Sequence, residues 1–241
     1  MRSLLLALSA VMWVAQPALA QPAPAAEAAA DPHERVYDTL LALSDDGPMV
    51  EAVLDWMVAQ IRGDPNVARL AADYPSLLGD VRNAARPIIV DYSQRVKRDY
   101  RPRMVALLRA ELSAADAAEI AEFYASPIGR RIVAGVSANY RPDTVLGTID
   151  DDRAVTAADV SRDLGNATQA TLQGLSPAET EELYREIAAR PAMTRLAPVV
   201  PKLAALRAQM EEEPMTAEEE AAIGVALRKV FAKLEVERKG G

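Results

Sequence analysis

The chain has 241 residues with 27 basic and 35 acidic side chains, which gives a formal net charge of -8. An acidic chain is repelled by phosphate backbones, so duplex nucleic acid is excluded as the main partner. The chain has no cysteine and one histidine, which excludes disulfide staples and zinc sites built from several His or Cys ligands. Apolar residues make up 50% of the chain and aromatic residues 5%. Because much of the apolar fraction is alanine, the composition predicts closely packed helices.

Residues 1–20 have the three parts of a secretory signal peptide. Arg2 supplies the positive start, an apolar run extends from Leu4 to Ala15, and Ala18-Leu19-Ala20 places small residues before an expected cleavage at Gln21. The apolar run is shorter than the about 20 residues that a transmembrane helix needs. We therefore expect an exported protein with no transmembrane span after cleavage. A flexible Pro/Ala-rich leader is predicted over residues 21–32.

Helical periodicity begins after this leader. Apolar residues at helical spacing predict one helix over residues 48–61 and a shorter one that ends near Tyr74. From Arg86 to about Leu112 the pattern indicates one long helix or two collinear helices. Pro102 is expected to kink or break it, because proline removes a backbone donor and crowds the preceding turn.

The most ordered pattern follows this segment. Ser113 is predicted as a helix N-cap, and the aromatic pair Phe123-Tyr124 lies on the apolar face of that helix. Ser126 and Pro127 then end one helix and begin the next, as N-cap and first helical residue. Gly129 has no side chain, so a neighbouring helix can approach closely. The segment therefore reads as an αα-hairpin.

The second half of the chain has similar signals for helix starts. Ser176 and Thr216 each precede a glutamate by three residues, the spacing of a capping box. The intervals Ser113 to Pro127 and Ser176 to Pro191 are nearly equal, which suggests a degenerate internal repeat. We predict an all-α array of about eight short helices in αα-hairpins. Its two halves are residues 33–150 and residues 151–239, and whether the second is a true repeat stays open.

The stretch from Leu112 to Ile132 resembles the domain of unknown function family numbered twenty fifty-nine. The resemblance is carried by Phe123-Tyr124-Ala125-Ser126-Pro127-Ile128-Gly129, an aromatic pair followed by a Ser-Pro-x-Gly helix junction. It extends over roughly Arg86 to Tyr140. It implies a helical fold and export, with the periplasm of a Gram-negative bacterium as the location. It implies no activity.

A search for chemistry gives no catalytic, cofactor or metal residues. His33 is the only histidine, lies beside the predicted leader and is read as a solvated surface residue. Asp150-Asp151-Asp152 lacks the alternating ligands of a calcium loop and is read as a polar linker. The runs Glu211–Glu213 and Glu218–Glu220 are read as solvated helix faces with capping roles, because adjacent helix residues point in different directions.

Two residue sets leave alternatives open. Basic residues around the hairpin form either a face for an anionic ligand or a solvated face partly neutralised by the acidic half. The pair Phe123-Tyr124 either floors a ligand pocket or packs in the core. The candidate anion face consists of Arg95, Lys97, Arg98, Arg101, Arg130 and Arg131.

From these observations we expect a non-enzymatic exported interaction or structural protein. Its partner is either an unidentified envelope protein or a second copy, through alanine-rich helix faces. One alternative is a binding module that holds an apolar or anionic envelope ligand between helices. A second alternative is a hydrolase of envelope polymers, which needs two carboxylates about 5–10 Å apart in a cleft.

Overall fold

The computed structural model describes residues 31–42 and 46–240, so the predicted signal peptide and residues 21–30 of the leader lie outside the described residues. The described residues form helices and connecting turns without any strand, which confirms the all-α class. Their α-helices number twelve, more than the eight expected, because proline-containing turns divide segments that periodicity alone would join.

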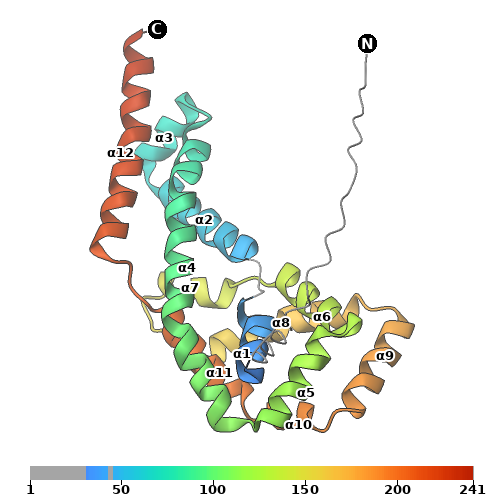
Figure 1. The fold of residues 1–241 in the computed structure, drawn as a ribbon. Helices are drawn as coiled ribbons and strands as arrows, with labels where there is room; N and C mark the ends of the chain where they lie inside the picture. Colours follow the sequence, from blue (N-terminus) through green and yellow to red (C-terminus); the bar gives the residue numbers. More distant parts are fainter. Residues whose placement is uncertain (1–30, 43–45, 241) are drawn as a thin grey trace, which may run out of the picture. The chain divides into compact units, whose positions relative to one another are not determined.

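The first helices in chain order are α1 (Pro32–Tyr37), the π-helical turn η1 (Asp38–Ala42), α2 (Asp46–Gly63), α3 (Pro65–Asp73), α4 (Leu77–Glu111), α5 (Ala114–Ala125) and α6 (Pro127–Asn139). The remaining helices are α7 (Asp143–Asp150), α8 (Ala157–Gln173), α9 (Pro177–Ala188), α10 (Ala192–Leu196), α11 (Val200–Glu211) and α12 (Ala217–Gly240). Figure 1 shows them coloured along the sequence, and all belong to the unit Asp31–Gly241.

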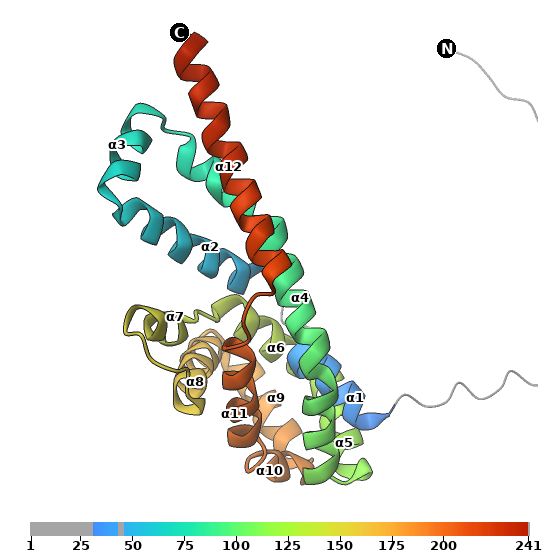
Figure 2. The same ribbon diagram turned by 90° about the vertical axis from the view of Figure 1, so that its left-hand side faces the viewer.

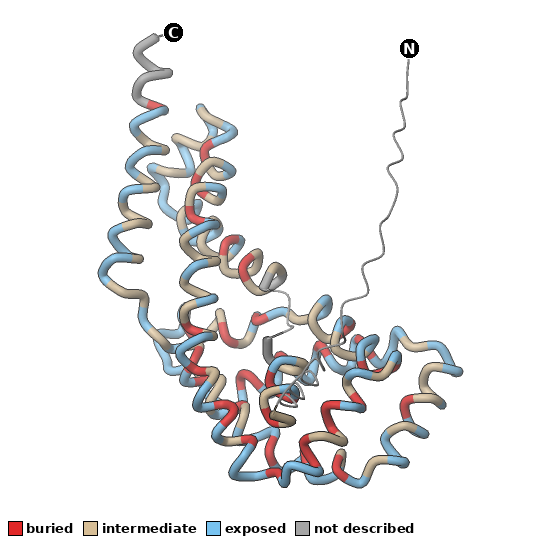
Figure 3. The backbone as a smooth tube through the Cα atoms, viewed as in Figure 1, coloured by how far each residue is buried: buried red, intermediate tan, exposed pale blue. Residues whose placement is uncertain are grey.

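Helix α4 has 35 residues and runs without interruption through Pro87 and Pro102. The segment is therefore one long helix, and it does not break at Pro102. Pro102 lies on the exposed side of the helix, whereas Tyr100, Met104 and Val105 around it are buried. Burial of this continuous apolar face stabilises the helix more than the loss of one backbone hydrogen bond destabilises it. Figure 3 shows buried positions recurring along α4 between exposed ones.

The two ends of α4 belong to different parts of the core. Near its N-terminal end, Leu77 and Val81 are fully buried and form a cluster with Leu234 of α12, against which residues of α2 and α3 pack. Nearby, Ala85 packs with Val50 and Leu54 of α2. In Figure 2, α12 runs alongside α4 in this region. The N-terminal part of α4 thus packs against α2, α3 and α12 through two separate clusters.

The C-terminal half of α4 contributes to the largest cluster. Leu108 is fully buried there, together with Val36 of α1, Ile120 of α5 and Val199 before α11. The helix then ends at Glu111 with Leu112 as its C-cap, and Ser113 is the N-cap of α5. The hairpin that carries the aromatic pair is therefore anchored to α4 by the core itself.

Elements from the two sequence halves pack against each other. Gly135 of α6 lies against Thr171 of α8, where any added Cβ would meet the threonine methyl group. Two turns earlier in α8, the fully buried Asp163 accepts hydrogen bonds from the backbone amides of Thr144 and Val145, at 3.1 Å each. These contacts fix α8 between α6, α7 and α11.

Candidate interaction surface

The aromatic pair lies in the core. Phe123 is 2% exposed and packs with Ile128 and Leu183. The rings of Phe123 and Tyr124 meet edge to face, with centroids 4.9 Å apart and planes at 78°. Burial raises the pKa of Tyr124 to about 12. These contacts favour core packing over the floor of a ligand pocket.

The junction between α5 and α6 has the N-cap serine that the sequence predicts. Ser126 ends α5 and begins α6, and its hydroxyl accepts a hydrogen bond from the Gly129 amide at 3.1 Å. A Cβ on Gly129 would collide with the backbone oxygen of Phe123 and lie 2.7 Å from Cα of Tyr124. The close neighbour of Gly129 is therefore the last turn of α5.

The three predicted N-caps lie at helix starts. The hydroxyl of Ser113 accepts a hydrogen bond from the Asp116 amide at 3.1 Å. Ser176 and Thr216 form reciprocal capping boxes with the glutamates three residues later, Glu179 and Glu219. Asp116 does not close such a box, because its carboxylate accepts from the Ser113 hydroxyl and forms an ion pair with Arg195.

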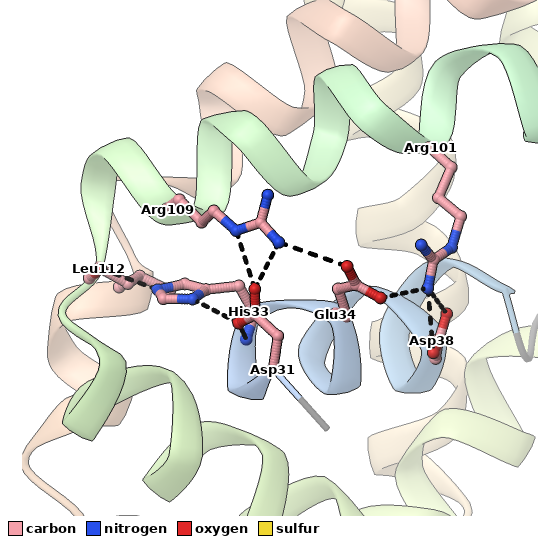
Figure 4. A network of polar contacts seen from close by, with 7 residues as sticks. All are labelled: Asp31, His33, Glu34, Asp38, Arg101, Arg109 and Leu112. Carbon is pink, nitrogen blue, oxygen red and sulfur yellow. Dashed lines mark hydrogen bonds and ion pairs between the residues drawn. The ribbon is translucent and has the colours of Figure 1, made fainter. Parts of the chain in front are cut away.

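The expectation of a solvated His33 is wrong. Its residue is 7% exposed, and both ring nitrogens have acceptors: Nδ1 lies 2.9 Å from Oδ1 of Asp31, and Nε2 lies 3.0 Å from the carbonyl oxygen of Leu112 (Figure 4). Asp31 also caps α1 by accepting from the His33 amide. These contacts tie the ring to both α1 and the turn after α4.

Two arginines of α4 extend this network along α1. Arg109 bonds Asp31 and Glu34, and Arg101 bonds Glu34 and Asp38 at 3.2 and 3.0 Å (Figure 4). The hydrogen bond from Arg109 is the main cause that holds the pKa of Asp31 well below its usual range. Helix α1 is thus held against α4 by these ion pairs as well as by its apolar residues.

The other members of the candidate anion face are also engaged within the chain or dispersed. Arg95 bonds Glu219 through two nitrogens, at 2.9 and 3.0 Å. Arg130 donates to the Ala125 carbonyl oxygen at 2.6 Å, and Arg131 lies 3.6 Å from Glu179. Lys97 is half-buried and Arg98 is exposed on α4. The arrangement favours a face neutralised by the chain's own acids.

Several carboxylates are likewise bonded to arginine side chains of this chain. Hydrogen bonds from arginine side chains are the largest cause of the lowered pKa of Glu51, Asp159 and Glu219. A general acid in a glycan-cleaving site needs the opposite shift. Asp151 and Asp152 lie in the turn after α7. Across residues 31–42 and 46–240, no group of three His, Asp or Glu side chains is placed to hold a metal ion.

A groove lies between α8 and α11, and Figure 2 shows these two helices beside each other. Its volume is about 590 Å³. The residues that line one wall recur at spacings of three and four along α8, and residues of α11 form the other wall. The lining residues are Ser161, Leu164, Gly165, Thr168, Gln169, Leu172, Gln173, Val200 and Ala204.

This groove is apolar, exposed and uncharged. Leu164, Leu172 and Val200 are 38%, 43% and 47% exposed, and none of the lining residues carries a charge. Residues 164–178 form a run of fifteen without an ionisable side chain, in a chain of which 26% of residues are charged. An exposed apolar surface with so little charge is typical of an interaction site.

A second groove between α4 and α12 has a different lining. It includes Val225, which is 42% exposed, but also Asp80, Lys229 and Lys233. Lys233 lies 3.6 Å from Asp80, so an ion pair crosses this groove. The second groove therefore has an exposed valine among charged residues. It is used below as a control for the α8–α11 groove.

Residues 99–136 match the model of the family DUF2059. That family is described as an uncharacterized protein conserved in bacteria. The match confirms the resemblance carried by the hairpin motif. No significant match to the chain was found among curated proteins or among solved structures.

The DUF2059 segment, residues 99–136, has a definite place in the fold. It comprises the end of α4, all of α5 and most of α6. Arg101, Arg109 and the Leu112 carbonyl belong to it, so it supplies the α4 side of the network around α1. The lining of the α8–α11 groove lies outside it. Among the described residues, no helix is both long enough and apolar enough to span a membrane.

Sequence reasoning missed two of these features. The burial of His33 follows from contacts 79 positions away and has no local signal. The α8 groove had a signal, the uncharged run of residues 164–178, but periodicity alone does not show which face of α8 the core leaves exposed. Only the packing of Val160, Ala167 and Thr171 inward leaves the leucines outside.

Proposed function

We propose that this chain is an exported, non-enzymatic interaction protein that binds an uncharged, apolar protein helix in the α8–α11 groove. The observation that carries the proposal is the absence of charge from a groove lined by exposed Leu164, Leu172 and Val200. Depletion of charged residues distinguishes the centre of a protein interface from ordinary protein surface.

The dimensions of the groove favour a helix as the occupant. Its wall on α8 extends from Ser161 to Gln173, which corresponds to about 18 Å at the rise of an α-helix. Spacings of three and four are those that receive the side chains of a facing helix. A small-molecule site encloses most of its ligand, whereas the leucines here stay more than one-third exposed. The groove therefore suits a helix better than a small envelope ligand.

The non-enzymatic part of the proposal is supported by how the ionisable groups are used. Both nitrogens of His33 contact acceptors of the fold. Carboxyl groups such as Asp31 and Glu219 have a lowered pKa because arginines bond them, which suits ion pairing and not proton donation.

Export is supported by the signal-peptide pattern of residues 1–20. It is tested by fractionating the native bacterium and sequencing the N-terminus of the protein. We expect the protein in the periplasmic fraction with Gln21 as its first residue. A cytosolic protein that retains Met1 would overturn this part of the proposal.

The groove is tested by photo-crosslinking in growing cells. A photoreactive phenylalanine analogue is placed at Thr168 in the groove, and at Val225 as a control that is also exposed in a groove but has charged neighbours. We expect a protein adduct at position 168 that disappears when Leu164→Glu and Leu172→Glu are added, and whose cross-linked peptide maps to a helix with an uncharged apolar face. No adduct at 168, or equal adducts at both positions, would overturn the proposal.

A further inference from the structure

We propose that the helix bound in the α8–α11 groove is α8 of a second copy of this chain, lying antiparallel about a two-fold axis at Thr168. This inference rests on the proposed function of the groove as a helix-binding face. It adds the identity of the occupant, and with it the symmetry of the assembly.

The first argument is the internal symmetry of the groove. Leu164 and Leu172 each lie four residues from Thr168, on the same side of α8. If two α8 helices cross antiparallel at Thr168, Leu164 of one copy faces Leu172 of the other. The two-fold axis then forms the same contact twice, as an isologous interface requires. An unrelated partner would give no reason for this placement.

The second argument is electrostatic. The chain carries a net charge of -8, so two copies repel each other over most approaches. The uncharged run of residues 164–178 is a surface on which this repulsion is weakest. Two copies of an uncharged face can pack together, since their contact brings no like charges together. The same face gives no electrostatic advantage to a strongly basic or acidic partner.

The third argument decides the direction of pairing. Asp159 and Asp163 of α8 are buried, and the exposed charged residue of this helix is Arg162, near its N-terminal end. A parallel pair would bring the two Arg162 side chains to the same end. An antiparallel pair about Thr168 separates their positions by about 18 Å along the axis. Antiparallel helix dipoles are also mutually favourable.

Gly165 is consistent with close approach of the second helix. A Cβ at Gly165 would meet nothing within 4 Å, so the monomer does not need a glycine there. A glycine inside a helix costs about 1 kcal/mol relative to alanine. At Gly129 and Gly135 the fold itself explains the glycine, because a Cβ would collide with a neighbour. At Gly165 the nearby surface is the groove, where a small residue lets a helix backbone come close.

Single-cysteine variants test this geometry directly, because the chain has no cysteine of its own. Under mild oxidation of the purified full chain, we expect Thr168→Cys to form a disulfide-linked dimer rapidly. Ser161→Cys should cross-link at least tenfold more slowly, since the two positions 161 would lie about 21 Å apart along the axis. Val225→Cys is the control and should form no disulfide-linked dimer. Equal rates at positions 161 and 168 would overturn the antiparallel arrangement.

Solution mass, measured by light scattering over a range of concentrations, provides the second readout. We expect a dimer for the unmodified chain and a monomer for Leu164→Glu combined with Leu172→Glu. Leu164→Lys combined with Leu172→Glu places opposite charges face to face only in the antiparallel pair, so it should retain more dimer. Val225→Glu should not change the mass. Circular dichroism confirms that each variant is folded.

The outcomes separate this inference from the proposed function. A monomeric unmodified chain without a Thr168→Cys dimer overturns self-association. If the adduct at position 168 in cells then contains a different protein, the groove is still a helix-binding site. If no adduct forms at all, both proposals fall.

Discussion

The imidazole Nε2 of His33 lies 3.0 Å from the backbone carbonyl oxygen of Leu112, 79 positions further along the chain. This contact joins the start of α1 to the turn between α4 and α5. It places the single histidine at the meeting point of α1 and the DUF2059 segment. The stability of that junction can be measured.

We expect His33→Ala to lower the free energy of unfolding by about 1–3 kcal/mol, because it leaves the buried carbonyl of Leu112 without its partner. Hydrogen exchange should also become faster at the amides of α1. Arg35→Ala, on the exposed side of the same helix, is the control and should change stability by less than about 0.5 kcal/mol. Equal stability of the two variants would contradict a structural role for the ring.

Gly129→Ala tests the junction of the hairpin. The added methyl group would collide with the backbone oxygen of Phe123, so we expect a loss of at least about 1–3 kcal/mol. Thermal unfolding measures the loss. Gly79→Ala is the matched control, because a Cβ there meets nothing within 4 Å and alanine favours the helix. A melting temperature for Gly129→Ala at or above that of the parent would reject the close approach.

Ser176→Ala tests the capping box of α9. The hydroxyl accepts a hydrogen bond from the Glu179 amide at 3.3 Å, and its loss should cost about 1 kcal/mol. Ser176→Asp supplies another N-cap acceptor and should recover most of the loss in urea unfolding. If alanine and aspartate behave alike at this position, the cap contributes nothing measurable.

Acid should weaken the fold through its arginine-bonded carboxylates. Side-chain hydrogen bonds from Arg109 and Arg153 are the largest causes of the lowered pKa of Asp31 and Asp159, respectively. A carboxyl group whose pKa is lower in the folded state stabilises the protein above its unfolded pKa of about 3.9, and this contribution is lost as the pH falls below it. We expect the melting temperature to decrease progressively below a pH of about 4.

Arg153→Met isolates one of these contributions. Its melting temperature should lie below that of the parent at neutral pH, and the gap should narrow as the pH falls below about 4, because the unfolded chain then takes up a proton that the arginine-bonded Asp159 of the folded parent resists. Arg98→Met removes an exposed arginine from α4 and should follow the parent at every pH. A difference between Arg153→Met and the parent that does not change with pH would show that the ion pair is not responsible.

Local features of the sequence determined the helices and their ends. Ser113, Ser126 and Ser176 begin helices because their hydroxyls satisfy amides that have no partner in the first turn, and this chemistry spans three residues. The same locality made the hairpin motif recognisable as a resemblance to DUF2059. Turns such as those around Pro191 and Pro198 divide the described residues into more helices than the eight expected.

Only the tertiary structure decided where polar and apolar groups lie relative to one another. The continuity of α4 through Pro102 depends on apolar residues from several helices that bury its face. The burial of His33 depends on Leu112, and the exposure of Leu164 and Leu172 depends on which face of α8 meets α6, α7 and α11. Hydrophobic burial is a sum over contacts between distant segments, so a single stretch of sequence does not contain it.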